Sequence, residues 1–96
     1  MPAEPAIGEV EISGWDLGGA PFAETTRIYA KQSEFNVILQ SAVAPNAIVV
    51  VRYGPAGAWG ARRPVLCKVS FVHWLGRGAG YEVTIRECGQ GASDAE

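Results

Sequence analysis

The residues from Gly14 to Glu24 form a glycine-rich corner, GWDLGGAPFAE, between two stretches in which apolar and polar residues alternate. Alternation with a period of two is typical of a strand with one buried face. Gly18 and Gly19 permit backbone conformations that other residues reach only with strain, and Pro21 presets an extended turn. Because short alternating runs and tight corners recur along the chain, we predict an all-β fold with little or no helix.

The length of 96 residues allows one compact domain with one core. The longest unbroken apolar run, Ala47–Val51, is far shorter than the roughly 20 residues that cross a bilayer. Residues 1–7 lack the basic start and apolar segment of a secretion signal, so we expect a cytoplasmic protein with no membrane contact. The formal net charge of −2 argues against a broad basic surface for nucleic acid.

Six strands are predicted, and they are Glu9–Trp15, Thr25–Lys31, Phe35–Leu39, Ile48–Tyr53, Val65–Trp74 and Tyr81–Cys88. The second and third strands should form a hairpin. The alternation predicts several inward-facing side chains: Val10, Ile12, Val65, Cys67, Val69, Phe71, Tyr81, Val83 and Ile85. In Ile48–Tyr53 the run of apolar residues hides the period, which favours a central strand that is covered on both faces.

A closed antiparallel barrel is the architecture that protects the edges of six short strands without helices. We therefore predict a small six-stranded antiparallel β-barrel over residues 8–88. Residues 1–7 and 89–96 are expected to be disordered tails, because they hold proline or polar residues and little to pack. The stretch Gly54–Arg63, with three glycines and one proline, is expected to be a mobile loop.

The glycine-rich corner belongs to a longer pattern, Val10-x-Ile12-x-Gly14-x-Asp16-x-x-Gly19-x-Pro21-Phe22-x-Glu24-Thr25-Thr26. Together with the later strands Val65–Trp74 and Gly80–Glu87, this pattern resembles PilZ domains. The resemblance covers about residues 8–88, and its specific part is the corner. It implies a PilZ-like split barrel of six strands from a family best known as receptors for the bacterial second messenger cyclic di-GMP.

The family's ligand site combines an Arg-x-x-x-Arg pair before the first strand with an Asx-x-Ser-x-x-Gly turn between the second and third strands. Arginine suits this site because its planar guanidinium binds phosphates through two hydrogen bonds and stacks on guanine. Here no arginine precedes Arg27, and the resemblance places Tyr29, Lys31 and Glu34 at the Asx, Ser and Gly positions. Glu34 adds bulk and negative charge, so the site is degenerate and no cyclic di-GMP or other cofactor is expected.

Catalytic and metal-binding groups are sparse. The only histidine, His73, shares the parity of Cys67 but lies at the end of its strand, so we expect a capping or partly exposed histidine at the barrel rim. It is six residues from Cys67 on the same strand, too far for a dyad. Two cysteines and one histidine without close spacing do not make a zinc site, and the cysteines have opposite parities, so no disulfide is expected. The carboxylates predicted to face outward are dispersed over the strands: Glu9, Glu11, Glu82 and Glu87.

We therefore predict a non-catalytic module of bacterial signalling that acts through contacts with an unidentified protein partner, and that could self-associate through an open sheet edge. Exposed aromatic and arginine side chains are the candidate anchors, namely Tyr29, Trp59, Arg62, Arg63 and Trp74. Two alternatives stay open. One is an atypical cyclic di-GMP receptor that uses Arg27 or Arg62 and Arg63. The other is a small barrel that binds single-stranded nucleic acid.

Overall fold

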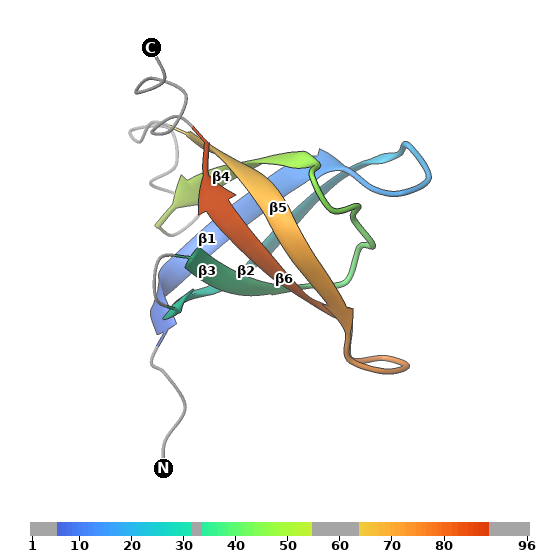
Figure 1. Cartoon of the computed structure of the whole chain (residues 1–96). Coiled ribbons are helices and arrows are strands. Elements are labelled where there is room, and N and C mark those ends of the chain that lie inside the picture. The colour runs from blue at the N-terminus through green and yellow to red at the C-terminus, as the bar shows by residue number, and fades with distance from the viewer. Residues whose placement is uncertain (1–5, 32–33, 55–63, 89–96) are drawn as a thin grey trace.

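A closed β-barrel is the architecture of the computed structural model, which describes residues 6–31, 34–54 and 64–88. The strands are β1 (Ala6–Trp15), β2 (Pro21–Lys31), β3 (Glu34–Leu39), β4 (Ile48–Tyr53), β5 (Val65–Trp74) and β6 (Tyr81–Glu87) (Figure 1). Neighbours around the barrel follow the order β1-β2-β3-β6-β5-β4, and all pairs are antiparallel. The described residues form no helix, so the prediction of a six-stranded antiparallel barrel is confirmed.

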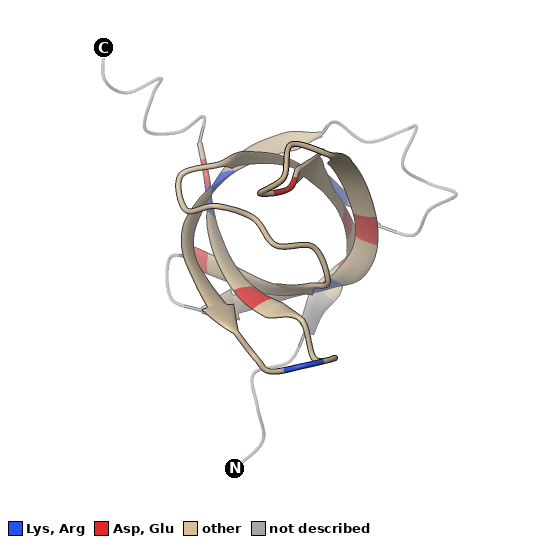
Figure 2. Cartoon of the chain, turned by 90° about the vertical axis from the view of Figure 1, so that its right-hand side faces the viewer, with Lys and Arg blue, Asp and Glu red and all other residues tan. Residues whose placement is uncertain are grey.

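The core lies inside the ring of strands, which Figure 2 shows nearly end-on. β-Branched side chains dominate it because they pack well on a pleated surface. Its fully or almost fully buried members are Val10, Ile12, Ile28, Val37, Leu39, Val43, Val49, Val51, Cys67, Val69, Val83 and Ile85. The inward faces predicted for β1 and β6, and for the first half of β5, are therefore confirmed.

The prediction that β4 is a central strand covered on both faces is wrong. β4 pairs with β1 on one side and with β5 on the other, as any strand of a closed barrel has two neighbours. Val49 and Val51 face the core, whereas Ile48 on the outer face is 48% exposed. An apolar run can thus belong to a strand with one solvent face.

The inward assignment of Phe71 is also wrong, because β5 contains a β-bulge between Val69 and Phe71. The extra residue, Ser70, reverses the alternation, so that Val72 packs against the core and Phe71 is 58% exposed. The bulge lies where β5 passes the end of β4. There, Val69 exchanges backbone hydrogen bonds of 2.7 and 2.8 Å with the turn that precedes β4.

The glycine-rich corner between β1 and β2 is organised by Asp16. One oxygen of its carboxylate accepts hydrogen bonds from the backbone amides of Gly18 and Ala20, both at 2.9 Å. Gly19 adopts a positive φ of 86°, which glycine tolerates without the clash of a Cβ atom. The aspartate and glycine of the PilZ-like pattern therefore have local structural roles at this turn.

Glu24 of the same pattern fixes a second corner, where the chain leaves the end of β3. Its carboxylate accepts hydrogen bonds from the amide of Gln40 at 2.7 Å and from the amide and hydroxyl of Ser41 at 2.8 and 2.6 Å. The segment from 40 to 47, green at the right of Figure 1, then leads to β4. Its Val43 belongs to the core, so this segment helps to fill the barrel.

The boundaries of the barrel differ slightly from those expected. β1 begins at Ala6, within the predicted tail of residues 1–7, and Ala6 pairs with Tyr29 ahead of a register irregularity at Gly8. Residues 1–5 and 89–96 and most of the predicted mobile loop, 55–63, lie outside the described residues. Within the described ranges, no helix has the length and apolar character needed to cross a membrane.

Candidate functional site

The side chains predicted to anchor a partner do not form one cluster in the part of the chain that the structure describes. Trp74 is 62% exposed at the end of β5, while Tyr29 is half-buried on β2. Strands β3 and β6 separate the two. The other three candidates, Trp59, Arg62 and Arg63, lie outside the described residues.

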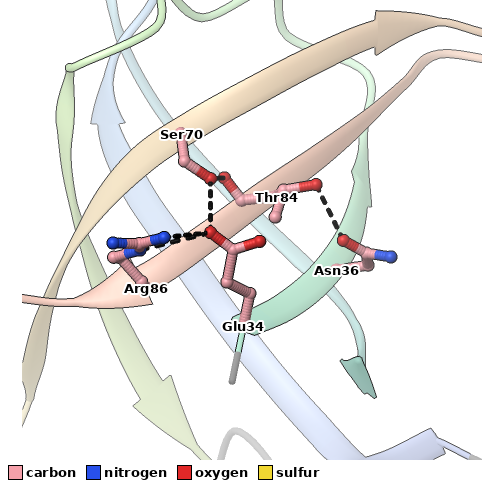
Figure 3. Close-up of polar contacts among 5 residues, drawn as sticks. All are labelled: Glu34, Asn36, Ser70, Thr84 and Arg86. Carbon is pink, nitrogen blue, oxygen red and sulfur yellow. Dashed lines mark hydrogen bonds and ion pairs between the residues drawn. The ribbon is translucent and has the colours of Figure 1, made fainter. Parts of the chain in front are cut away.

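A polar network covers the outer face of β3, β6 and β5 (Figure 3). Glu34 accepts hydrogen bonds from Nη2 and Nε of Arg86 at 2.7 and 3.2 Å and from the hydroxyl of Ser70 at 3.2 Å. Beside it, the hydroxyl of Thr84 donates to Oδ1 of Asn36 at 2.9 Å. Ion pairs this exposed stabilise a fold by at most about 1 kcal/mol, so the network mainly fixes side-chain positions.

Glu34 was expected at the glycine position of the ligand turn, where its charge would face a bound dinucleotide. It is the first residue of β3 and pairs with Lys31, the last residue of β2. Its carboxylate extends across the sheet toward β6 and β5, where the guanidinium of Arg86 balances its charge. The position is thus occupied by a side chain that contacts Arg86 on β6 and Ser70 on β5.

His73 is exposed near the end of β5, in keeping with the expected histidine at the barrel rim, and the bulge reverses the parity that it would share with Cys67. It lies opposite Glu82 and stacks on Phe71 with ring centroids 6.5 Å apart. Glu87 is exposed, as predicted for an outward-facing carboxylate. It pairs with Cys67, whose side chain faces inward, but Glu87 is the last residue of β6 and therefore reaches solvent. Among the described residues, no three His, Cys, Asp or Glu side chains are grouped as metal ligands.

An apolar strip lies on the outer face of β1, β4 and β5, and consists of Trp15, Ile48, Val50 and Leu66. Trp15, Ile48 and Leu66 are 63%, 48% and 53% exposed, and Val50 pairs directly with Leu66. Gly14 brings β1 close to β4, since a Cβ atom on it would lie 3.4 Å from the carbonyl oxygen of Ile48. The strip therefore crosses three adjacent strands.

Sequence reasoning missed the apolar strip for two reasons. The parity of Ile48 and Val50 was hidden in an unbroken apolar run, and strand neighbours cannot be read from local alternation. One signal was available, however. Leu66 has the same outward parity as Lys68. In this first half of β5 the inward face was assigned correctly, so the outward position of Leu66 could be predicted. A leucine on a solvent face could therefore have marked this surface.

A shallow depression of about 240 Å³ lies next to the apolar strip, at the β5 bulge. We call it the bulge pocket, and it is lined by Asn46, Lys68, Val69, Ser70 and Arg86. Lys68 lies directly between Ile48 on β4 and Arg86 on β6. The bulge pocket and the apolar strip therefore share one continuous outer face of the barrel.

The two cysteines of the described chain are free thiols in different settings: Cys67 is buried in the core and Cys88 is partly exposed after β6. Burial raises the pKa of the Cys67 thiol to about 12, and Cys88 and Glu87 add to this rise. Since nucleophilic cysteines act as thiolates, Cys67 is unsuited to nucleophilic catalysis at neutral pH.

The raised pKa of Cys67 predicts a loss of stability in alkaline solution. Above the ordinary thiol value of 9.0, the unfolded chain releases a proton that the folded chain retains up to about pH 12, so the free energy of unfolding falls as pH rises. Denaturant titrations should show a loss of about 1 kcal/mol from pH 8 to pH 10. Cys67→Ala should lose this component and Cys88→Ala should keep it; equal slopes in both would contradict the assignment.

Comparison with protein-family models, curated proteins and solved structures finds no significant match to this chain. The PilZ resemblance stays a prediction that rests on the sequence pattern from Val10 to Thr26. The chemistry of the barrel's outer face therefore carries the functional argument.

Proposed function

We propose that this protein is a non-catalytic interaction module that binds a protein partner through the apolar strip. The observation that carries the proposal is the clustering of Trp15, Ile48 and Leu66 on three adjacent strands, each about half exposed or more. Single exposed apolar side chains are common, but contiguous ones mark binding surfaces. Tryptophan is also among the residues that most often dominate binding energy.

The chemistry of the remaining groups supports a binding role over catalysis. The imidazole of His73 is exposed and stacks on Phe71, and the thiol of Cys67 is buried and protonated. The PilZ resemblance and the degenerate ligand turn at Tyr29, Lys31 and Glu34 support a role in bacterial cytoplasmic signalling without a bound nucleotide. The partner then takes the place of the second messenger as the recognised molecule.

The closed barrel restricts how the module makes contacts. Every described strand has a neighbour on both sides, so an open sheet edge, the route to self-association suggested by the sequence, is absent from the described part of the chain. Partner contacts must therefore come from side chains on the outer face, as the apolar strip provides.

The nucleic-acid alternative finds less support on the described surface. Acidic and basic residues are interspersed around the barrel end seen in Figure 2, whereas single strands require a basic groove with stacking aromatics. The side chains that favoured this alternative, Trp59, Arg62 and Arg63, lie outside the described residues. The apolar strip is thus the better supported surface.

Quantitative affinity purification from the native host tests the apolar strip. We expect Leu66→Lys to reduce recovery of the specific partner at least about 10-fold, because a central anchor contributes about 2 kcal/mol or more. Leu17→Lys is the matched control, since Leu17 is 65% exposed in the β1–β2 corner, outside the strip. Both variants should unfold at the temperature of the parent protein, as substitutions on an exposed surface have small effects.

Equal recovery of all partners by Leu66→Lys, Leu17→Lys and the parent protein would exclude the apolar strip as the binding surface. Sedimentation of the purified protein tests whether the apolar strip binds a second copy of the chain. A dimer that Leu66→Lys converts to a monomer would identify a second copy of the chain, in place of a different protein, as the occupant of the strip.

A further inference from the structure

We infer that the bulge pocket is an oxyanion site that receives a phosphate monoester carried by the protein partner. The inference that a protein partner carries the phosphate rests on the proposed function, whereas the inference of an oxyanion site does not. Two cationic side chains define the site, since Lys68 on β5 and Arg86 on β6 lie directly opposite each other. Like charges in this arrangement repel and destabilise a sheet pair, and a bound anion between them would remove that repulsion.

The charges around the bulge pocket leave an unbalanced positive charge. Glu34 balances one cation, and its Oε2 binds Nε and Nη2 of Arg86. Lys68 makes no ion pair within the described residues, and the same holds for Nη1 of Arg86. Glu34 therefore acts as a positioning residue that orients the guanidinium, while Lys68 and Nη1 stay available for a ligand.

The lining of the bulge pocket favours an oxyanion over a cation. Its lining residues include the cations Lys68 and Arg86 and the amide Asn46, and no described Asp or Glu is among them. The carboxylate of Glu34 contacts Arg86 and Ser70 from beside the pocket. Asn46 has a positive φ of 75°, and its backbone amide donates to the carbonyl of Val69 at 2.7 Å. This geometry fixes the position of Asn46 beside the bulge, and bulges commonly occur next to functional sites.

A phosphate monoester suits this site better than a carboxylate. It carries a charge of about −1.5 to −2 at neutral pH and three terminal oxygens, enough to contact three donor groups together. The volume of about 240 Å³ also leaves room for the ester group beyond the phosphate. A carboxylate offers one charge and two oxygens to the same donors.

The position of the bulge pocket indicates that the phosphate belongs to a protein. Ile48 of the apolar strip pairs directly with Lys68, so the strip begins one strand spacing, about 5 Å, from the cationic pair. A phosphorylated side chain followed by apolar residues could occupy both features together. A free phosphorylated metabolite would use only the pocket.

Titration with inorganic phosphate tests the site by itself. Amide resonances of the parent protein should shift saturably at Asn46, Lys68 and Ser70 when sodium phosphate replaces sodium chloride at constant ionic strength and pH 7.5. Lys68→Gln should weaken this binding at least about 5-fold, since it removes one of two charged contacts. Arg77→Gln, which alters an exposed cation in the β5–β6 turn, should leave the binding unchanged.

Absence of saturable shifts, or equal weakening by Lys68→Gln and Arg77→Gln, would overturn the oxyanion site. These outcomes concern the oxyanion site alone. The proposed function is tested separately by recovery of the partner with Leu66→Lys, an experiment in which no phosphate is titrated, so one can fail while the other holds.

Peptides then identify the carrier. A phosphoserine peptide with adjacent leucines should bind at least about 10-fold more tightly than its serine and glutamate counterparts, and Leu66→Gln, which removes the apolar contact without adding charge, should weaken it. Phosphopeptide binding no tighter than inorganic phosphate, or unaffected by Leu66→Gln, would overturn a protein carrier. Binding equally tight for the glutamate peptide would overturn the preference for phosphate.

Discussion

Replacing Gly80 with alanine is expected to lower the free energy of unfolding by about 3 kcal/mol, a large part of the stability of a small domain. Gly80 precedes β6 with a positive φ of 87°, where a side chain costs about 1–2 kcal/mol. A Cβ atom would also lie 2.6 Å from both the carbonyl oxygen of Leu39 and Nε2 of Gln40. Because the first of these atoms is backbone, β3 and β6 must separate locally.

Thermal unfolding measures the effect of Gly80→Ala, and a decrease in melting temperature on the order of 15 °C is expected for a chain of this size. Gly78→Ala is the matched control. Gly78 has a positive φ of 81°, but a Cβ atom added to it would have no neighbouring atom within 4 Å, so this variant experiences only the conformational strain. Equal decreases in melting temperature for both variants would show that the close approach of Gly80 to Leu39 contributes nothing to the loss of stability in Gly80→Ala.

Replacing Glu24 with alanine is expected to cost about 3 kcal/mol and to loosen the corner after β3. The substitution removes the acceptor of three short hydrogen bonds from Gln40 and Ser41, and bonds to a charged group contribute about 1.5–3 kcal/mol each without full additivity. The segment that follows carries Val43 into the core, so loosening the corner also weakens packing at that end of the barrel.

Hydrogen exchange distinguishes this local effect from a general loss of stability. In Glu24→Ala, the amides of Gln40 and Ser41 should exchange far faster than in the parent protein at matched global stability. Thr25→Ala, at an exposed neighbouring position on β2, should leave their exchange unchanged. Unaltered protection of both amides in Glu24→Ala would refute the role of the carboxylate at this corner.

Both substitutions act at the point where β3 ends, although Gly80 and Glu24 are far apart in the sequence. Glu24 belongs to the PilZ-like pattern, and its hydrogen bonds give that residue a structural role that is independent of any ligand. A motif of this kind therefore carries information about the shape of the barrel. It carries none about the molecule that the barrel binds.

The sequence predicted the strands and most inward faces because alternation is a local property. Val10 and Ile12 on β1, like Val83 and Ile85 on β6, could be assigned without knowing which strands pair, since a strand with one buried face shows a period of two by itself. The prediction failed where one residue changes the period. The bulge at Ser70 reversed the faces of Phe71 and His73, and no local pattern marks such an insertion.

Within the described residues, the sequence alone determined the six strands, the glycine corners and most of the core. Only the tertiary structure decided which strands are neighbours, and therefore which outer-face side chains meet. Trp15, Ile48 and Leu66 form one surface because β4 pairs with both β1 and β5. Lys68 faces Arg86 because the register between β5 and β6 places the two residues opposite each other. These pairings depend on the packing of the whole core, which acts between residues far apart in the chain.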